Sequence, residues 1–222
     1  MMHFDVIVPF GTSCMCSDIL REQGLQMYSY PFDWVGGGTL ETRTNILVND
    51  FKDWLNYDDL VQIEPLDNLK TRKFKDFLNV KTCMTFRHHF SVDKNSPNFI
   101  EDYSTVKEKY TRRAERLKHQ IQQSDNVLMI TIETPNRYKI KHVQELLLAH
   151  NMLAKKFSMT NIQLLYIKHS DNKNMKCSNV YNNIQMIDRF YTNDPSSNYD
   201  IALLVHNIFQ AYDIRLSQKF CR

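Results

Sequence analysis

The sequence predicts an α/β protein with a mostly parallel sheet and helices on both faces. Three observations predict this class: apolar runs rich in β-forming residues, as in 4–10 and 126–132, amphipathic segments such as 139–156, and a regular alternation of the two. Strands that alternate with helices favour a parallel sheet covered on both faces. The 222 residues are enough for one sizeable core, so we expect a single α/β domain over 1–222.

The first unit of this fold is a strand, a tight turn and a helix. Residues 4–10 form a nearly continuous apolar run, which is typical of a buried strand. A polar turn at 11–13 leads into a predicted helix over 14–23, and Gly24 provides its C-terminal stop. Cys14 is therefore expected at the point where a strand ends and a helix begins.

The remaining elements continue the alternation. Residues 27–34 are rich in aromatic side chains and predict an ordered loop or a short edge strand, and the three glycines 36–38 predict a flexible turn. Residues 51–82 read as mixed, with short helical stretches. Further helices are predicted over 39–50, 100–123, 139–156 and 202–212, and further strands over 83–90, 126–132, 163–168 and 184–190.

Composition narrows the class of protein. Hydrophobic residues make up 42% and charged residues 24%, which is ordinary for a globular chain. Apolar runs such as 201–205 are far too short to span a bilayer, and the N-terminus lacks the basic segment of a secretory signal. The five cysteines are irregularly spaced, which argues against a disulfide framework. We therefore expect a cytoplasmic protein with reduced thiols.

The charge pattern gives little support for nucleic-acid binding. The net charge is +3, and the main basic cluster, residues 107–118, is interleaved with acidic side chains as on a solvated helix face. No pattern of basic and aromatic residues indicates a nucleic-acid module. Arg112 and Arg113 in this cluster are the candidates for an alternative role, the binding of phosphate or another anion.

Cys14 is the strongest candidate for chemistry. The free N–H groups and the positive end of a helix stabilise a thiolate, and they can also hold an oxyanion during acyl transfer. The alternative is that Cys14 is a small packing residue. Cys16 lies further inside the predicted helix and is expected to point inward. A spacing of two does not fit the usual zinc or redox pair, so we expect no metal.

A cysteine nucleophile needs a base. His88 and His89 end a predicted strand and are the best pair, and only one of them can face a given site because neighbouring strand residues point to opposite sides. We assign His88 as the base and His89 as the alternative. Asp33, between two aromatic residues, is a candidate for orienting the base, although it could equally pin the loop through structural hydrogen bonds. Trp34 beside it is a candidate wall of the site.

Several of these residues together resemble a family labelled putative papain-like cysteine peptidases. The most specific block is VIVPFGTSC at 6–14, followed by YSYPFDWV at 28–35. Looser similarity continues through 88–90, the helix containing Tyr110, and the strand at 127–130, so that the resemblance spans about residues 4–170. It implies that Cys14 is the nucleophile and His88 its partner, and that such proteins work beside glycan-assembly enzymes.

The chain departs from papain itself in two ways that weaken a protease interpretation. It lacks the Cys-Gly-Ser-Cys-Trp sequence, and its candidate Asp33 precedes the histidine. We therefore favour a cysteine-nucleophile acyltransferase that modifies a sugar or nucleotide-sugar through a Cys14 thioester. Acyl-CoA would be the co-substrate, bound in part by Arg112 and Arg113, with no tightly bound cofactor. A papain-like peptidase or amide hydrolase is the first alternative, and a non-catalytic binding module is the second. The oligomeric state is left open.

Overall fold

The structure is a computed structural model. It describes residues 2–52, 54–64, 73–133, 140, 142–169, 176–181, 183–189, 197–211, 213–217, 219 and 220. Within these ranges, no helix combines the length and apolar character that a membrane span requires.

A five-stranded sheet forms the centre of the molecule. Its order is β2 (Val6–Pro9), β7 (Asn126–Ile132), β8 (Asn161–His169), β10 (Ile184–Arg189) and β9 (Lys176–Tyr181). The first four strands are mutually parallel, and β9 pairs antiparallel with β10. The α/β class expected from the alternating pattern is confirmed, and the four parallel strands fall within a residue or two of the predicted runs.

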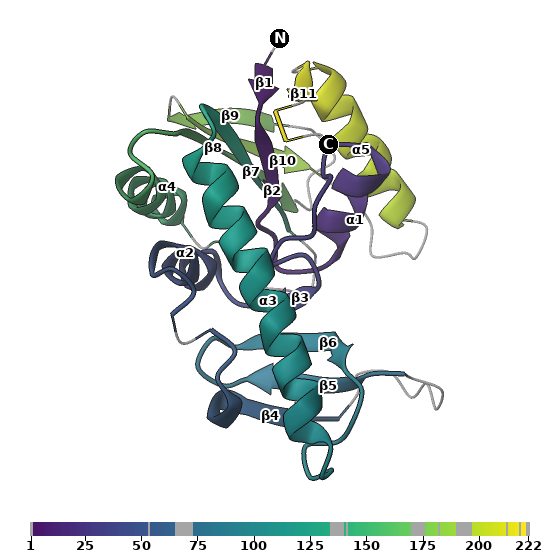
Figure 1. Ribbon diagram of the computed structural model, residues 1–222. Coiled ribbons are helices and arrows are strands. Elements are labelled where there is room, and N and C mark those ends of the chain that lie inside the picture. The colour runs from purple at the N-terminus through teal and green to yellow at the C-terminus, as the bar shows by residue number, and fades with distance from the viewer. Residues whose placement is uncertain are drawn as a thin grey trace.

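Helices cover both faces of this sheet because its strands are apolar on both sides. Ile7 of β2 belongs to one buried cluster, with side chains of α1 (Met15–Glu22) and α5 (Ser197–Ala211). Its neighbours Val6 and Val8 belong to a second cluster, on the opposite face. That cluster also contains side chains of the helices α2 (Leu40–Val48), α3 (Phe99–Gln122) and α4 (Gln144–Lys156). Figure 1 shows α1 and α5 together on one side and α4 on the other.

A second sheet corrects the expectation of a mostly parallel architecture. It is antiparallel, in the order β3 (Val35–Gly37), β6 (Met84–Phe90), β5 (Lys75–Asn79) and β4 (Leu60–Ile63), and a single 3-10 turn, Tyr57–Asp59, precedes β4. A flexible turn was expected at 36–38 and short helical stretches within 51–82. These parts of the chain instead contribute three strands, β3, β4 and β5. These strands are short, and they gain stability from partners distant in sequence rather than from their own pattern.

The helix α3 joins the two sheets. At its start, Phe99 packs against Phe77 and Phe90 of the antiparallel sheet, with ring centroids 5.2 and 5.8 Å away. Near its end, Leu117 and Ile121 are buried in the same cluster as strands of the central sheet. Figure 1 shows α3 running along the molecule from one sheet to the other. A separate parallel pair, β1 (Met2–Phe4) and β11 (Ile214–Leu216), brings the two ends of the chain together.

Local signals placed most helix ends correctly. Gly24 follows α1 with a φ of +68°, and the Thr39 hydroxyl accepts a hydrogen bond from the Thr42 N–H at 3.0 Å, which caps α2. The helix predicted from residue 139 begins only at Gln144, and most of the preceding segment lies outside the described residues. The last helix, α5, begins at Ser197, five residues before the predicted start at residue 202.

Candidate active site

Cys14 lies at the carboxyl edge of the central sheet. Strand β2 ends at Pro9, and Cys14 is the residue that precedes the first turn of α1. Its carbonyl accepts a hydrogen bond from the N–H of Asp18 at 3.0 Å, so the helix begins directly at the cysteine. The N–H groups of the first turn lie outside the helical hydrogen-bond ladder and mark the positive end of the helix. The half-buried Cys14 side chain therefore sits where an anion is stabilised.

Cys16 has the opposite environment. It is 1% exposed, and its thiol donates a hydrogen bond to the Ile130 carbonyl at 3.4 Å. Burial raises the pKa of Cys16 to about 12, so this thiol stays protonated. The inward orientation expected for Cys16 is confirmed. Of this pair, only Cys14 reaches the surface.

Two neighbouring hollows share Cys14 and Trp34 as walls. The larger, of about 410 Å³, lies along α1. Its lining residues are Cys14, Met15, Asp18, Ile19, Arg21, Glu22 and Trp34. The smaller, of about 30 Å³, is lined by Ser13, Cys14, Trp34, Gly36, Arg87 and His88. The sequence-predicted residues Cys14, Trp34 and His88 are thus brought to one place.

His88 is exposed and packs against the tryptophan of the site. The ring planes of His88 and Trp34 meet edge to face at 79°, with centroids 6.1 Å apart. This contact holds the imidazole beside the wall that it shares with Cys14. An exposed histidine next to a cysteine at a helix start is an arrangement that can accept the thiol proton.

His89 is held away from these hollows. Its Nε2 lies 2.6 Å from the Tyr110 hydroxyl, and its Nδ1 lies 3.1 Å from the Lys109 amino group. Burial, and then the charges of Lys109 and Arg113, lower the pKa of His89 to about 3. His89 is therefore a neutral, buried side chain, and the structure does not bring this alternative base to Cys14.

Asp33 is fully buried at the end of an aromatic loop. One of its oxygens, Oδ2, accepts hydrogen bonds from Arg21 at 2.7 Å, from Gln26 at 2.8 Å and from the Tyr30 N–H at 2.9 Å. Burial raises the pKa of Asp33, and these three donors oppose that rise. The contacts found for this carboxylate are those of a residue that pins the loop. None of them reaches His88.

The strand β3 holds the Trp34 wall against the Cys14 turn. The N–H of Gly37 donates to the Thr12 carbonyl at 2.9 Å, and the buried Arg43 donates to the carbonyls of Val35 and Gly37. Gly37 has a φ of +73°, and a Cβ at this position would overlap the carbonyl oxygen of Cys83. The glycine run thus permits a close approach of three backbone segments, which explains why it is a strand rather than a flexible turn.

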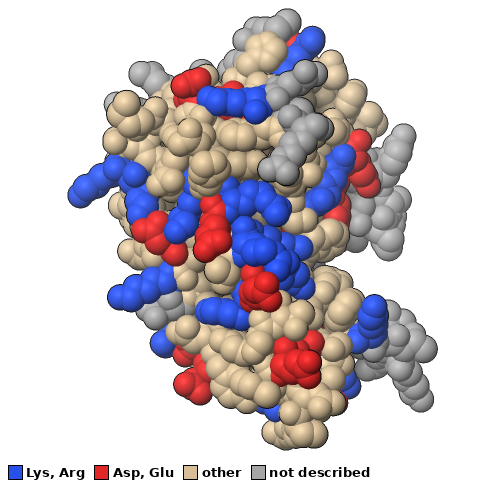
Figure 2. All heavy atoms as spheres, viewed as in Figure 1, with Lys and Arg blue, Asp and Glu red and all other residues tan. Residues whose placement is uncertain are grey.

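Arg112 and Arg113 lie outside both hollows. Arg112 is exposed and pairs with Glu108 one turn earlier on α3, at 3.0 Å, while the Arg113 guanidinium lies 5.5 Å from the centre of the Tyr110 ring. Figure 2 shows basic side chains gathered over α3 with acidic side chains among them. Arg112 thus lies on the solvated helix face that the charge pattern indicated, whereas Arg113 is partly buried against Tyr110.

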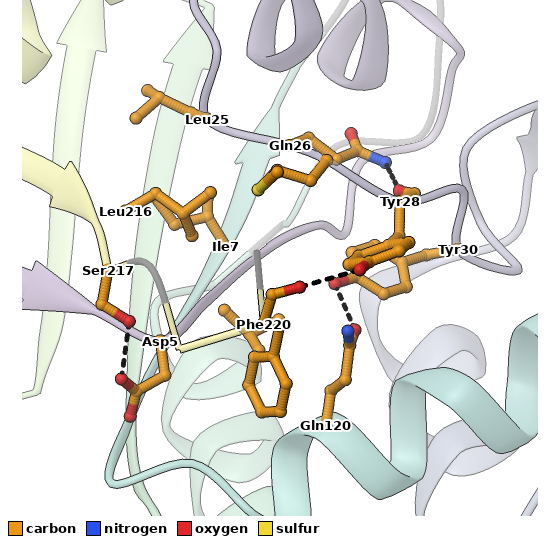
Figure 3. Close-up of a pocket in the computed structure, with 12 residues that line it drawn as sticks. Asp5, Ile7, Leu25, Gln26, Tyr28, Tyr30, Gln120, Leu216, Ser217 and Phe220 are labelled. Carbon is orange, nitrogen blue, oxygen red and sulfur yellow. Dashed lines mark hydrogen bonds between the residues drawn. The ribbon is translucent and has the colours of Figure 1, made fainter. Parts of the chain in front are cut away.

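A third cavity lies apart from Cys14, at the amino end of β2. Its walls include Asp5, Ile7 and Leu216, and Figure 3 shows Tyr28 and Tyr30 reaching across it toward Phe220 and Gln120. The Tyr28 hydroxyl donates to the Phe220 carbonyl at 2.8 Å, and the Tyr30 hydroxyl donates to Gln120 at 2.6 Å. Its volume of about 10 Å³ is enough for one water molecule. The hollow beside Cys14 therefore has the better dimensions for a substrate.

Sequence reasoning did not assign the charged residues of the two hollows to the site, namely Asp18, Arg21, Glu22 and Arg87. One signal was available: Asp18 follows Cys14 by four positions, which places both on one helix face. For Arg87, the sequence offered no sign of which strand face would meet Cys14. In the portion of the chain that the structure covers, His, Cys, Asp and Glu side chains form no group of three or more suited to a metal ion.

A comparison with protein families gives a match over most of the chain. A family model described as "Putative papain-like cysteine peptidase" matches residues 5–172, close to the range of about 4–170 expected from the sequence blocks. The matched range includes every residue that lines the two hollows beside Cys14. No curated protein and no solved structure gives a significant match.

Proposed function

Because the chain belongs to the family described as putative papain-like cysteine peptidases, we propose that it catalyses acyl transfer through a thioester on Cys14. The observation that carries this proposal is the shared wall of the smaller hollow, where Cys14 at the start of α1 meets His88 at the end of β6. A thiol, a base and the positive end of a helix are the parts that nucleophilic catalysis needs.

In the proposed reaction, the Cys14 thiol gives its proton to His88, and the sulfur attacks the acyl carbon of the substrate. The bond from that carbon to its amine or alkoxide leaving group breaks, and His88 passes the proton to the leaving group. Water then attacks the thioester and gives a proton to His88, the C–S bond breaks, and the sulfur recovers that proton. The products are a carboxylic acid and an amine or alcohol.

The start of α1 would stabilise the charge that develops on the acyl oxygen. When the sulfur adds to the acyl carbon, that oxygen becomes an anion close to the first turn of the helix. The N–H groups of Met15, Cys16 and Ser17 belong to this turn and have no earlier helical carbonyl to bind. Asp18 is the first residue of α1 whose N–H is engaged by the ladder, through Cys14.

Hydrolysis of an amide or ester is the reaction class that this geometry supports best. His88 is exposed and Cys14 is only half-buried, so water can reach a thioester formed there. The acyl-CoA donor favoured on sequence alone gains no support from the positions of Arg112 and Arg113, which lie outside both hollows. The larger hollow is lined by two acidic side chains, Asp18 and Glu22, and by one cation, Arg21, which is already paired with Asp33 at 2.7 Å. This lining offers no cluster of cations for the phosphates of CoA.

Transfer to a sugar amine or hydroxyl is the second candidate. The same thioester serves both reactions, and the larger hollow of about 410 Å³ has room for a sugar-sized acceptor beside Cys14. The choice between them depends on whether water or the acceptor takes the acyl group.

The test is acylation of the protein by donors of different chemistry. p-Nitrophenyl acetate, acetyl-CoA and a set of peptide amides are each incubated with the protein, and intact mass and peptide mapping follow the adduct. We expect one acetyl group on Cys14 from the activated ester, and its loss in Cys14→Ala. A Cys83→Ser variant is the matched control, because it removes an exposed thiol away from the hollows. An adduct that persists in Cys14→Ala would contradict the proposal.

Release of the acyl group distinguishes the two reaction classes. If hydrolysis is the reaction, the adduct decays in buffer alone, and added amino sugars do not accelerate the decay. If transfer is the reaction, decay depends on the sugar, and the acetylated sugar is recovered as product. Formation of the adduct from acetyl-CoA as rapidly as from the ester would restore the CoA-dependent reaction to first place.

A further inference from the structure

The smaller hollow beside Cys14 has a cationic lining. None of its six lining residues is acidic, and one of them, Arg87, carries a permanent positive charge. The start of α1 at Cys14 adds N–H groups that lie outside the helical ladder. The larger hollow mixes two acidic side chains with one arginine, and that arginine is paired with Asp33. An anionic group is therefore favoured in the smaller hollow rather than in the larger one.

Arg87 keeps hydrogen-bond donors for a ligand. Its Nε lies 3.7 Å from Asp76, which is longer than a charge-assisted hydrogen bond of about 2.7–2.9 Å. This Nε has no hydrogen-bond partner among the residues that the structure describes. A guanidinium has five N–H donors in a fork that matches the two oxygens of a carboxylate. Because Arg87 lines the hollow, these donors are available to a group inside it.

Ser13 adds a buried hydroxyl to the same hollow. The residue is 9% exposed, and its Oγ has no hydrogen-bond partner within the described ranges of the chain. Buried hydroxyls in native proteins nearly always pair with another protein group or with water. Ser13 directly precedes Cys14, so an anion that accepts a hydrogen bond from it lies close to the sulfur.

The volume of this hollow suits a small anion. Its 30 Å³ or so is two to three times the roughly 10–15 Å³ that one water molecule needs. A carboxylate, with two oxygens on one carbon, matches both this space and the fork of Arg87. A complete substrate is too large for it, so the rest of the molecule extends past Trp34 and Cys14, the walls that the two hollows share.

We propose that the smaller hollow binds a carboxylate of the substrate, held by Arg87 and the Ser13 hydroxyl beside the Cys14 sulfur. Arg87 is then the residue that determines specificity. This inference rests on the proposed function and names its substrate class: amides or esters whose acyl group carries a carboxylate close to the carbon that Cys14 attacks. The carboxylate is bound and does not react.

The test compares two alkylating reagents of similar size. Iodoacetate carries a carboxylate next to its reacting carbon, and iodoacetamide carries a neutral amide there. The iodoacetate to iodoacetamide rate ratio at Cys14, divided by the same ratio at the exposed Cys83, removes the intrinsic difference between the reagents. We expect a normalised ratio of about ten in the native protein, because a charge-assisted hydrogen bond in a partly exposed hollow favours the anionic reagent. A ratio near one would overturn the carboxylate site.

Substitutions then assign the effect to its residues. Arg87→Gln should bring the ratio close to one by slowing iodoacetate alone, and Arg87→Lys, which keeps the charge but loses the fork, should keep part of it. Ser13→Ala removes one donor and should lower the ratio about twofold to threefold. The matched control is Arg112→Gln, which removes an exposed arginine that lines neither hollow and should leave the ratio unchanged.

The variants also separate recognition of a carboxylate from a simpler electrostatic role. If Arg87 only stabilised the Cys14 thiolate, Arg87→Gln would slow both reagents equally and the ratio would persist, which contradicts the proposal. Thermal unfolding checks that each variant folds, since Arg87→Gln removes the cation beside the buried Asp76. Should that variant fail to fold, the ratio in the native protein and in Ser13→Ala still decides.

Activated esters extend the comparison to acylation. p-Nitrophenyl hemisuccinate, whose acyl group ends in a carboxylate, is compared with the neutral p-nitrophenyl butyrate. Dividing the rate of Cys14 acylation in the native protein by that in Arg87→Gln cancels the intrinsic reactivity of each ester. We expect a quotient of about ten for the hemisuccinate and about one for the butyrate. Equal quotients would assign Arg87 to the acyl oxygen instead and would overturn the carboxylate site.

The two proposals fail in different ways. If neither reagent alkylates Cys14 faster than Cys83, Cys14 is not a nucleophile, and the proposed function fails. If Cys14 reacts faster than Cys83 but does so equally with charged and neutral reagents, only the carboxylate site is lost.

Discussion

Cys14 and Cys16, two positions apart, have opposite environments because about half a helical turn carries the side chain from the surface to the core. Cys14 precedes α1 and lines both hollows, whereas Cys16 is 1% exposed and bound to the Ile130 carbonyl. The first residue before a helix faces the free N–H groups, and two residues later the side chain has turned through about 200° toward the sheet. Position relative to the helix start, rather than the cysteine itself, decides which thiol can react.

Iodoacetamide should therefore discriminate between the thiols of the native protein. We expect Cys14 to label near neutral pH at least about tenfold faster than the exposed Cys83, because a helix start favours the thiolate. Cys16, with a pKa of about 12, should label only after unfolding. Peptide mapping by mass spectrometry reads each site separately. Equal rates at Cys14 and Cys83 would remove the basis for nucleophilic catalysis.

Asp33 should matter for stability rather than for reactivity. The change Asp33→Asn keeps the shape of the side chain but removes the charge that Arg21 binds at 2.7 Å. We expect the free energy of unfolding to fall by about 1 to 2 kcal/mol, because the loop loses hydrogen bonds to a charged acceptor, whereas Arg21, with 31% of its side chain exposed, stays partly hydrated. Urea unfolding measures this loss. The pH profile of Cys14 alkylation is the control, and a shift of that profile without destabilisation would make Asp33 the orienting residue after all.

The choice between His88 and His89 as the base could be predicted from the sequence only in part. Alternation along a strand required that only one of His88 and His89 face the cysteine, but it could not say which. By simple alternation, His88 would share the buried face of Met84 and Phe86. The pairing of β5 with β6 contains an irregularity between Lys75 and Phe77, which shifts the later part of β6 and buries His89 instead.

At the scale of elements, sequence patterns succeeded where an element carries its own signal. The parallel strands are continuous apolar runs, and α3 has buried residues at helical spacing along its 24 residues. The antiparallel sheet gave no such signal. Its first strand, β3, has three residues, two of them glycine, and depends on Thr12, Arg43 and Met84 for its position. Contacts distant in sequence of this kind are invisible to a local pattern.

The glycines near the site provide a test of that dependence. Gly37→Ala adds a Cβ that overlaps the Cys83 carbonyl at a φ of +73°, so we expect a loss of about 3 kcal/mol or more in unfolding free energy. Gly24→Ala is the matched control, since Gly24 has a similar φ of +68° but nothing within 4 Å of the added atom. It should cost only about 1 kcal/mol from backbone strain. Similar losses in both would show that the close approach is unimportant.

At the scale of the whole molecule, the site depends on how the two sheets meet. The central sheet supplies Cys14 through β2 and α1, and the antiparallel sheet supplies His88 through β6. The two sheets are joined by α3 and by the hydrogen bond from the Gly37 N–H to the Thr12 carbonyl at 2.9 Å. The His89 ring lies 2.6 Å from the Tyr110 hydroxyl and 3.3 Å from the Trp34 carbonyl. His89 thus ties the end of β6 both to α3 and to the wall of the candidate site.

This join should make the stability of the whole fold depend on pH. Burial lowers the pKa of His89 from its usual 6.5 to about 3, so between these values the unfolded chain binds a proton that the folded chain does not. Stability from this residue is therefore complete above pH 6.5 and is lost as the pH falls toward 3, by up to about 1.4 kcal/mol per pH unit. Lys109 and Arg113 strengthen the effect, because both repel a charged imidazole.

The measurement is urea unfolding across that pH range for the native protein and for His89→Gln, which keeps a polar group toward Tyr110. The variant should lose most of the slope between pH 6.5 and 3, whatever its stability at neutral pH. His119→Gln is the control. It removes an exposed histidine from α3, the helix that carries Tyr110, and should retain the slope. The protonated His89 ring can no longer accept a hydrogen bond from Lys109 and is repelled by Lys109 and Arg113, so acidification should displace the end of β6 and the wall beside Cys14 before global unfolding. The fluorescence of Trp34, read in a Trp54→Phe background, should then change first. A slope that survives in His89→Gln would mean that other buried groups set the acid sensitivity of the fold.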